Sequence, residues 1–223
     1  MLFKNYPNTQ APSNYIRLLF IFADMCEAEA IINKYPFQKQ KNNFYTCWDA
    51  NHSCLMDILL LQQWGRQGVI SSLNTELLSN YHACLNIGFA GTSSFLFPLH
   101  SCYSIDRVAE LSSENPQTLS HQPELELISL SSLPLAHLVS SPTPYRYGMH
   151  DYFQLIDMEG YTISQLCKKQ NLPCMMIKIV SDYTTPEGGE YIKNNKHALA
   201  ETLYTTLKDS MDSIRSLVTS IHH

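Results

Sequence analysis

Two features are missing from this 223-residue chain, and each absence excludes a class of partner. No cluster of basic residues exceeds two in a row, and the net charge is −5, so the chain lacks the electrostatic footprint of a nucleic-acid-binding protein. The longest early apolar run, residues 18–23, is too short to span a bilayer, falls below the length of a signal-peptide core and ends at Asp24. We therefore predict neither a nucleic-acid partner nor a membrane partner.

Paired cysteines are missing as well. The seven cysteines form no C-x-x-C pair, and their number is odd. Most of them lie in apolar stretches, which argues against a disulfide framework or a zinc site and favours reduced, buried thiols in a cytoplasmic protein. The histidines show no ligand spacing, so we expect no metal and no other cofactor.

The patterning of the chain predicts its fold class. The length allows one sizeable core and is marginal for two. Strand-like and helix-like segments alternate without an internal repeat, which is typical of an α/β protein. We predict one domain over residues 15–223, with a central twisted, mixed β-sheet flanked by helices. Residues 1–14, with two prolines and several asparagines, resemble a loose N-terminal extension.

Apolar runs and helical spacing locate the individual elements. Strands are expected at 16–23, 55–61, 82–89, 103–111, within 125–139, from 155, and at 174–180. Helices are expected at 26–35, 69–79 and 161–170, and polar or proline-rich surface loops at 112–123 and 140–147. The chain closes with an amphipathic helix whose apolar residues recur every three or four positions: Leu199, Leu203, Leu207, Met211, Ile214, Leu217 and Ile221.

The stretch from 155 to 182 is the most informative part of the chain. Its first apolar run carries Met158 and Glu159, and its second ends in Ser181 and Asp182, with a helix-like segment between them. In an open α/β sheet the ligand binds at the carboxyl ends of the strands. Two carboxylates at neighbouring strand ends can hold a sugar and donate a proton in the same pocket.

Four motifs, in order along the chain, resemble those of the purine nucleoside phosphorylase / nucleosidase superfamily. Residues 85–91, Leu-Asn-Ile-Gly-Phe-Ala-Gly, look like its I-N-x-G-x-A-G strand and turn, and residues 157–160 resemble its (E/D)-M-E-(G/A) motif. Residues 178–182 are similar to R-x-x-S-D, and residues 22–30 match the early strand and turn that carry a catalytic glutamate. The segment from Gly65 resembles a further helix start, with Gln67 and Gly68 in place of the second Gly and the Lys. The likeness covers roughly residues 16–218.

The resemblance implies a role for each matched position. Glu159 binds the ribose hydroxyls and Met158 packs beneath the ribose. Asp182 is the general acid at the purine N7, and Glu27 holds and activates a water molecule. The matched turns add three further substrate-binding positions: Ala90, Gly91 and Ser181.

Plainer interpretations exist for the same residues. A carboxylate at a strand end is often a helix cap, and one that opens a helix is stabilised by the helix dipole without any function. Glu29 lies close to Glu27, and both are compatible with a solvated helix surface. The aromatic residues of 145–153 suit either stacking on a purine or packing within a surface loop.

The nucleophile and the substrate follow from the departures within the motifs. Asn86 stands where some phosphorylases carry an Arg, and an amide cannot give charge-assisted bidentate contacts to phosphate, which favours water. Cys102-Tyr103 departs from the usual methylthioadenosine enzyme pattern, so we favour futalosine or aminofutalosine, a menaquinone-biosynthesis substrate, over 5'-methylthioadenosine or S-adenosylhomocysteine. With Lys178 in place of Arg, these departures also keep open a non-catalytic nucleoside-binding homologue.

The resemblance also implies a small-molecule purine nucleoside as substrate and a homodimer as the assembly. In related enzymes a partner loop closes the 5' side of the pocket. The apolar segments 96–99 and 145–147 are the candidate contacts of that dimer.

Overall fold

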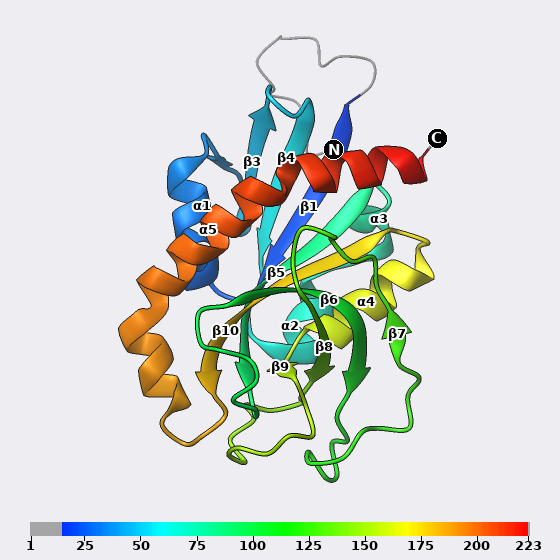
Figure 1. Cartoon of the computed structure of the whole chain (residues 1–223). Coiled ribbons are helices and arrows are strands. Elements are labelled where there is room, and N and C mark those ends of the chain that lie inside the picture. Colours follow the sequence, from blue (N-terminus) through cyan, green and yellow to red (C-terminus); the bar gives the residue numbers. More distant parts are fainter. Residues whose placement is uncertain (1–14, 223) are drawn as a thin grey trace.

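The computed structural model describes residues 15–222 and forms a single α/β domain (Figure 1). Its strands are β1 (Ile16–Phe22), β2 (Gln38–Lys39), β3 (Phe44–Asp49), β4 (Cys54–Leu60), β5 (Ala83–Thr92), β6 (Cys102–Glu110), β7 (Leu125–Glu126), β8 (Leu135–Ser140), β9 (Leu155–Asp157) and β10 (Cys174–Tyr183). Its helices are α1 (Met25–Lys34), α2 (Gly65–Ser72), α3 (Thr75–Leu78), α4 (Gly160–Lys169) and α5 (Gly188–Ile221).

All the strands belong to one mixed sheet. β5 lies at its centre, parallel to β1 on one side and to β10 on the other. Beyond β1 the sheet continues through β4, β3 and β2. On the other side, β10 also pairs with β6, which leads through β8 and β9 back to β5, so these five strands close into a ring. The long strands β5 and β10 thus run side by side through the middle of the molecule.

Helices cover both faces of the sheet (Figure 1). On one face α1 and α5 pack over alternate residues of β1, such as Leu18, Phe20 and Phe22. On the other face α2, α3 and α4 pack over the residues between them, Leu19 and Ile21. The strict alternation explains why β1 reads as a continuous apolar run: a strand buried on both faces has no polar side.

The last helix follows its predicted apolar stripe only in part. Residues 199, 203, 207, 211 and 214 are buried, as the spacing indicates. Near the end, Val218 takes the buried place, whereas Leu217 is half-buried and Ile221 is exposed. The buried positions from 199 to 218 follow steps of mostly four residues, slightly longer than one helical turn, so the buried stripe winds slowly around the helix and meets residue 218 rather than 217.

The fold prediction is confirmed, with local corrections. The helix expected at 69–79 is two helices, α2 and α3, and α2 begins at Gly65. Strands β2 and β3 were not predicted. The loop at 140–147 does not lie wholly on the surface, because Tyr145 is buried with Phe153 in a small cluster. The predicted extension, residues 1–14, lies outside the described residues.

None of the helices within residues 15–222 has the length and apolar character needed to cross a bilayer. In the same range, no three His, Cys, Asp or Glu side chains are grouped so that they could hold a metal ion. All seven cysteines are free thiols, and five of them are buried.

Candidate active site

Glu27 lies at the start of α1, where its carboxylate joins two elements. Oε2 accepts hydrogen bonds from the backbone N–H groups of Ala23 and Asp24, at 2.8 and 3.2 Å, which completes a capping box. Oε1 accepts from the N–H of Phe89 in β5, at 2.7 Å. The side chain is buried, unlike that of Glu29, which faces solvent and pairs with His197. Burial raises the pKa of Glu27 to about 6, against the lowering effect of Lys178 and these N–H groups.

Glu159 is buried at the start of α4. Its Oε1 accepts a hydrogen bond from the N–H of Gly65, at 2.5 Å. Gly65 has a φ of +76°, a conformation that glycine adopts readily, and this aims its N–H at the carboxylate. The methyl group of Met158 lies beside the same glycine. Burial first, and then the charge of Asp157, raise the pKa of Glu159 to about 7.

A buried ion pair interacts electrostatically with both of these glutamates. Nζ of Lys178, on β10, is 2.8 Å from Oδ2 of Asp157, at the end of β9, and both side chains are at most 2% exposed. Burial lowers the pKa of Lys178, but the charges of Asp157, Glu27 and Glu159 together outweigh that effect and raise it. Asp157 is also fixed by the hydroxyl of Ser140, which donates to Oδ1 at 2.6 Å. One ammonium group therefore faces three carboxylates.

Asp182 lies further along β10 and is 2% exposed. The register of β10 against β5 shifts between residues 180 and 182, so Ser181 lies at a bulge, and its hydroxyl donates to Oδ1 of Asp182 at 2.7 Å. Nη1 of Arg146 donates to Oδ2 at 3.3 Å. Burial raises the pKa of Asp182, while the Ser181 hydrogen bond and the Arg146 charge lower it.

β5 connects the two carboxylate groups. Phe89 binds Glu27, and Gly91, two residues on, is the register partner of Asp182, with the buried Ala90 between them. Two residues of a strand span roughly 7 Å, which is within the length of a nucleoside. Asn86, earlier in β5, is 1% exposed, and its amide donates to the carbonyl of Ile21 in β1 at 3.2 Å.

The predicted site residues are thus placed on adjoining strands and helix starts, and four further residues accompany them. Asp157 and Lys178 belong to recognised motifs, but no sequence pattern pairs them. Arg146 lies in a segment expected to be a surface loop. Trp64 is 61% exposed, precedes the glycine that binds Glu159, and donates its indole N–H to Asp24 at 3.2 Å. The only signal for it in the sequence is a tryptophan directly before a glycine.

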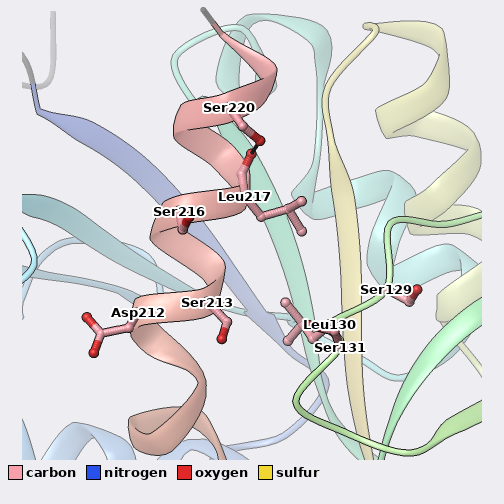
Figure 2. A pocket seen from close by; sticks show the side chains of 8 residues that line it. All are labelled: Ser129, Leu130, Ser131, Asp212, Ser213, Ser216, Leu217 and Ser220. Atoms are coloured by element: carbon pink, nitrogen blue, oxygen red, sulfur yellow. Dashed lines mark hydrogen bonds between the residues drawn. The ribbon is translucent and has the colours of Figure 1, made fainter.

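A groove of about 440 Å³ lies elsewhere, between residues 129–131 and the last turns of α5 (Figure 2). Five serines line it, together with Leu130, Leu217 and Asp212. None of the predicted site residues contributes to it. The charged cluster at the strand ends is therefore the better candidate for the active site.

Comparison with solved structures connects this arrangement to known enzymes. A protein of Chlamydia trachomatis described as MTAN, solved with MTA bound, is 37% identical, with a TM-score of 0.75 over 92% of this chain and 98% of that one. The same protein has been solved with adenine. No protein-family model and no protein of curated function matches the sequence.

Two more distant structures share the fold. A futalosine hydrolase mutant of Helicobacter pylori is 14% identical, with a TM-score of 0.74 over 88% of this chain and 99% of that one. A 5'-methylthioadenosine/S-adenosylhomocysteine nucleosidase from S. pneumoniae is 15% identical, with a TM-score of 0.73 over 89% and 100%. The chain belongs to the nucleosidase branch of the purine nucleoside phosphorylase superfamily, whose members of this kind hydrolyse the N-glycosidic bond of purine nucleosides.

Proposed function

We propose that this chain hydrolyses a purine nucleoside with a modified 5' position, and that the buried carboxylates divide the work. Glu159 binds the ribose hydroxyls, with Met158 packed beneath the sugar. Asp182 gives a proton to N7 of the base as the glycosidic bond breaks. Glu27 holds the attacking water, and Ala90, Gly91 and Ser181 shape the wall between them.

The charge of the cluster supports water, rather than phosphate, as the nucleophile. Three carboxylates, those of Glu27, Asp157 and Glu159, face the single ammonium group of Lys178. Even with Glu159 half-protonated near pH 7, the net charge is negative, and a phosphate dianion placed there would be repelled. A neutral water molecule meets no such cost, so this excess of buried negative charge is the observation that carries the proposal.

The same charge suits the transition state. Cleavage of a glycosidic bond passes through a sugar that resembles an oxocarbenium cation. Buried carboxylates in fixed positions stabilise a cation that develops next to them. The three backbone hydrogen bonds of Glu27 hold that carboxylate in place before the substrate arrives. A pKa of about 6 leaves it ionised at neutral pH and able to accept a proton from water.

The identity of the purine base in the substrate is proposed from the relative in Chlamydia trachomatis. That protein was solved with MTA and with adenine, so an adenine nucleoside is the first expectation for a chain 37% identical to it. Among adenine nucleosides, aminofutalosine and methylthioadenosine differ in their 5' substituents.

We keep aminofutalosine, or its deaminated form futalosine, as the first candidate because of Cys102-Tyr103. These residues lie on β6 and pair with Ile179 and Lys178 of β10, so the departure from the usual methylthioadenosine pattern is next to the strand that carries Asp182. Methylthioadenosine or adenosylhomocysteine is the second candidate, favoured by the MTA complex of the relative.

A release assay decides between these functions. The purified chain is incubated separately with methylthioadenosine, adenosylhomocysteine, aminofutalosine and futalosine, and with inosine plus phosphate, and free base is measured. We expect release without phosphate, at the highest kcat/KM with aminofutalosine. A higher value for methylthioadenosine would select the second candidate. Binding of a nucleoside without release of its base would favour the non-catalytic homologue, which the joint presence of Glu27, Glu159 and Asp182 argues against.

We also propose a homodimer. Phe95 and Leu96 are 73 and 80% exposed, and Phe95 packs against Tyr183, the residue after Asp182. Exposed apolar side chains of this size are typical of an interface. Light scattering at micromolar concentration should report twice the monomer mass, and Leu96→Asp should shift it towards monomer. A monomeric wild-type protein would contradict this proposal.

A further inference from the structure

The loop between β8 and β9 places a cation on the proposed proton donor. Nη1 of Arg146 is 3.3 Å from Oδ2 of Asp182, and the same nitrogen donates to the carbonyl of Tyr145 at 2.9 Å. The carboxylate is 2% exposed, whereas the arginine side chain is 34% exposed. The contact is a single hydrogen bond, without the bidentate geometry that makes Arg–carboxylate pairs strong. A partner of this kind can be displaced.

This contact opposes the chemistry proposed for Asp182. A general acid must carry a proton when the base leaves, and a guanidinium group next to it favours the ionised form. The other neighbours carry no opposing charge: β5 offers uncharged residues, and α5 begins at Gly188, a Cβ of which would lie 2.2 Å from Oδ2. Glu187, just before that helix, faces solvent. Burial raises the pKa of Asp182, and Arg146 is the charged neighbour that, together with the Ser181 hydrogen bond, favours the ionised carboxyl against that effect.

The loop is anchored beyond Arg146 and leaves its side chain room to move. The N–H of Gly148 donates to the carbonyl of Thr184 at 2.8 Å, and the N–H of His150 donates to that of Ser93 at 2.6 Å. These backbone bonds fix the path of the loop against β5 and β10. Because the side chain of Arg146 is long and one-third exposed, a rotation about its own bonds frees Asp182 without moving the loop.

We propose that Arg146 is a displaceable latch: it occupies the proton donor in the free enzyme and leaves when the purine base enters. The inference rests on the proposed function, in which Asp182 is the donor. Once released, Asp182 takes a proton from solvent. As the C1'–N9 bond breaks, its electron pair goes to the base, and the base takes that proton. Water bonds to C1' and gives its proton to Glu27, which returns it to solvent, so the protons balance.

The test is the affinity of adenine, measured by calorimetry with wild type and with Arg146→Gln. An ion pair whose cation is in contact with solvent contributes about 0.2–1 kcal/mol, so its loss should tighten adenine binding up to about 5-fold. Arg146→Lys keeps the charge and should bind like wild type, and Arg107→Gln, an exposed arginine away from Asp182, serves as control. In wild type, molar salt should also tighten binding, because it screens the pair. That measurement replaces the variant if Arg146→Gln does not fold.

The pH profile gives a second, independent readout. Without the cation the pKa of Asp182 rises, so the alkaline limb of kcat/KM should move to higher pH in Arg146→Gln and stay in place in Arg146→Lys. Weaker adenine binding with an unmoved limb would show that Arg146 binds the base or merely holds the loop, and would overturn the latch. Adenine binding without nucleoside cleavage would instead overturn the proposed function, while the affinity comparison would still decide on the latch.

Discussion

The two ends of the candidate site are built in different ways. At one end Glu27, Glu159, Asp157 and Lys178 are all buried, and backbone N–H groups or strand partners hold each of the carboxylates. At the other end Asp182 is equally buried, but its cation comes from a loop and is partly exposed. The first end is held by buried partners, whereas the cation at the second end is a partly exposed side chain.

This difference matches the two tasks proposed for the site. Binding a sugar and a water molecule benefits from groups that need no rearrangement, because reorganisation adds to the barrier. Donating a proton requires a group whose charge changes during the reaction. A regular scaffold therefore suits the first task, and a loop that carries a removable charge suits the second.

The largest effect is expected at the loop-controlled end. Asp182→Asn keeps the shape and removes the transferable proton. General acid catalysis typically contributes about 100- to 10,000-fold, so kcat for base release should fall by that range, while adenine binding persists. Asp106→Asn, a partly exposed aspartate that pairs with His137, is the control and should keep wild-type activity. An equally active Asp182→Asn enzyme would mean that the proton comes from another group.

At the fixed end, Glu27→Gln should lower kcat by about 100-fold or more, because the water loses its base. The base acts when ionised, so with a pKa of about 6 the wild-type rate should fall as the pH drops below about 6, and this limb should vanish in the variant. The matched control is Glu29→Gln, two residues along the same helix but facing solvent. If the two variants have the same activity and pH profile, Glu27 is only a helix cap.

Lys178→Met tests whether the fixed end is also a structural element. The substitution leaves Asp157 buried without its cation, and breaking a buried pair typically costs about 3–5 kcal/mol. Urea unfolding should show a loss of stability of that size. Arg66→Met removes an exposed pair with Glu110 and should cost at most about 1 kcal/mol. A similar loss of stability in the two variants would contradict the distinction between buried and exposed charge.

The carboxylates that follow the strands were the more predictable part of the site from sequence. Glu159 and Asp182 follow apolar runs, and the carboxyl ends of strands are where ligands bind, so their positions follow from local pattern. Lys178 lies inside an apolar run, and its partners come from β9, α1 and the start of α4. Nothing near it in the chain reveals that they meet. The contact of Arg146 depends on the path of a proline-containing loop, which no periodicity describes.

One missed element did leave a signal. Strands β2 and β3 form an antiparallel pair, and Asn42 and Asn43 in the turn between them both have positive φ, 57° and 60°. Adjacent residues of that kind are typical of a tight hairpin turn. Here the charged residues around 38–41 masked a short strand, because an exposed edge strand has no apolar face to recognise.

A smaller effect is expected for Glu159→Gln. The substitution keeps the side-chain size and removes the carboxylate proposed to accept hydrogen bonds from the ribose hydroxyls. A hydrogen bond to a charged group contributes about 1.5–3 kcal/mol, so KM should rise about 10- to 100-fold. Binding of free adenine, which has no ribose, should be unchanged and serves as the internal control. A loss of adenine binding would show that the variant disturbs the site as a whole.

The smallest effect should come from Trp64, which links the two walls of the fixed end: its indole binds Asp24, and the next residue binds Glu159. We propose that its exposed ring packs against the 5' substituent of the substrate. Burying about 40 Å² of apolar surface contributes about 1 kcal/mol.

Trp64→Ala should therefore raise KM about 5-fold for a 5'-modified nucleoside and leave it unchanged for adenosine, measured by base release. Trp64→Phe keeps an apolar ring without the indole N–H, so it should restore most of the difference. An equal rise in KM for both nucleosides would show that Trp64 holds the wall rather than the substituent.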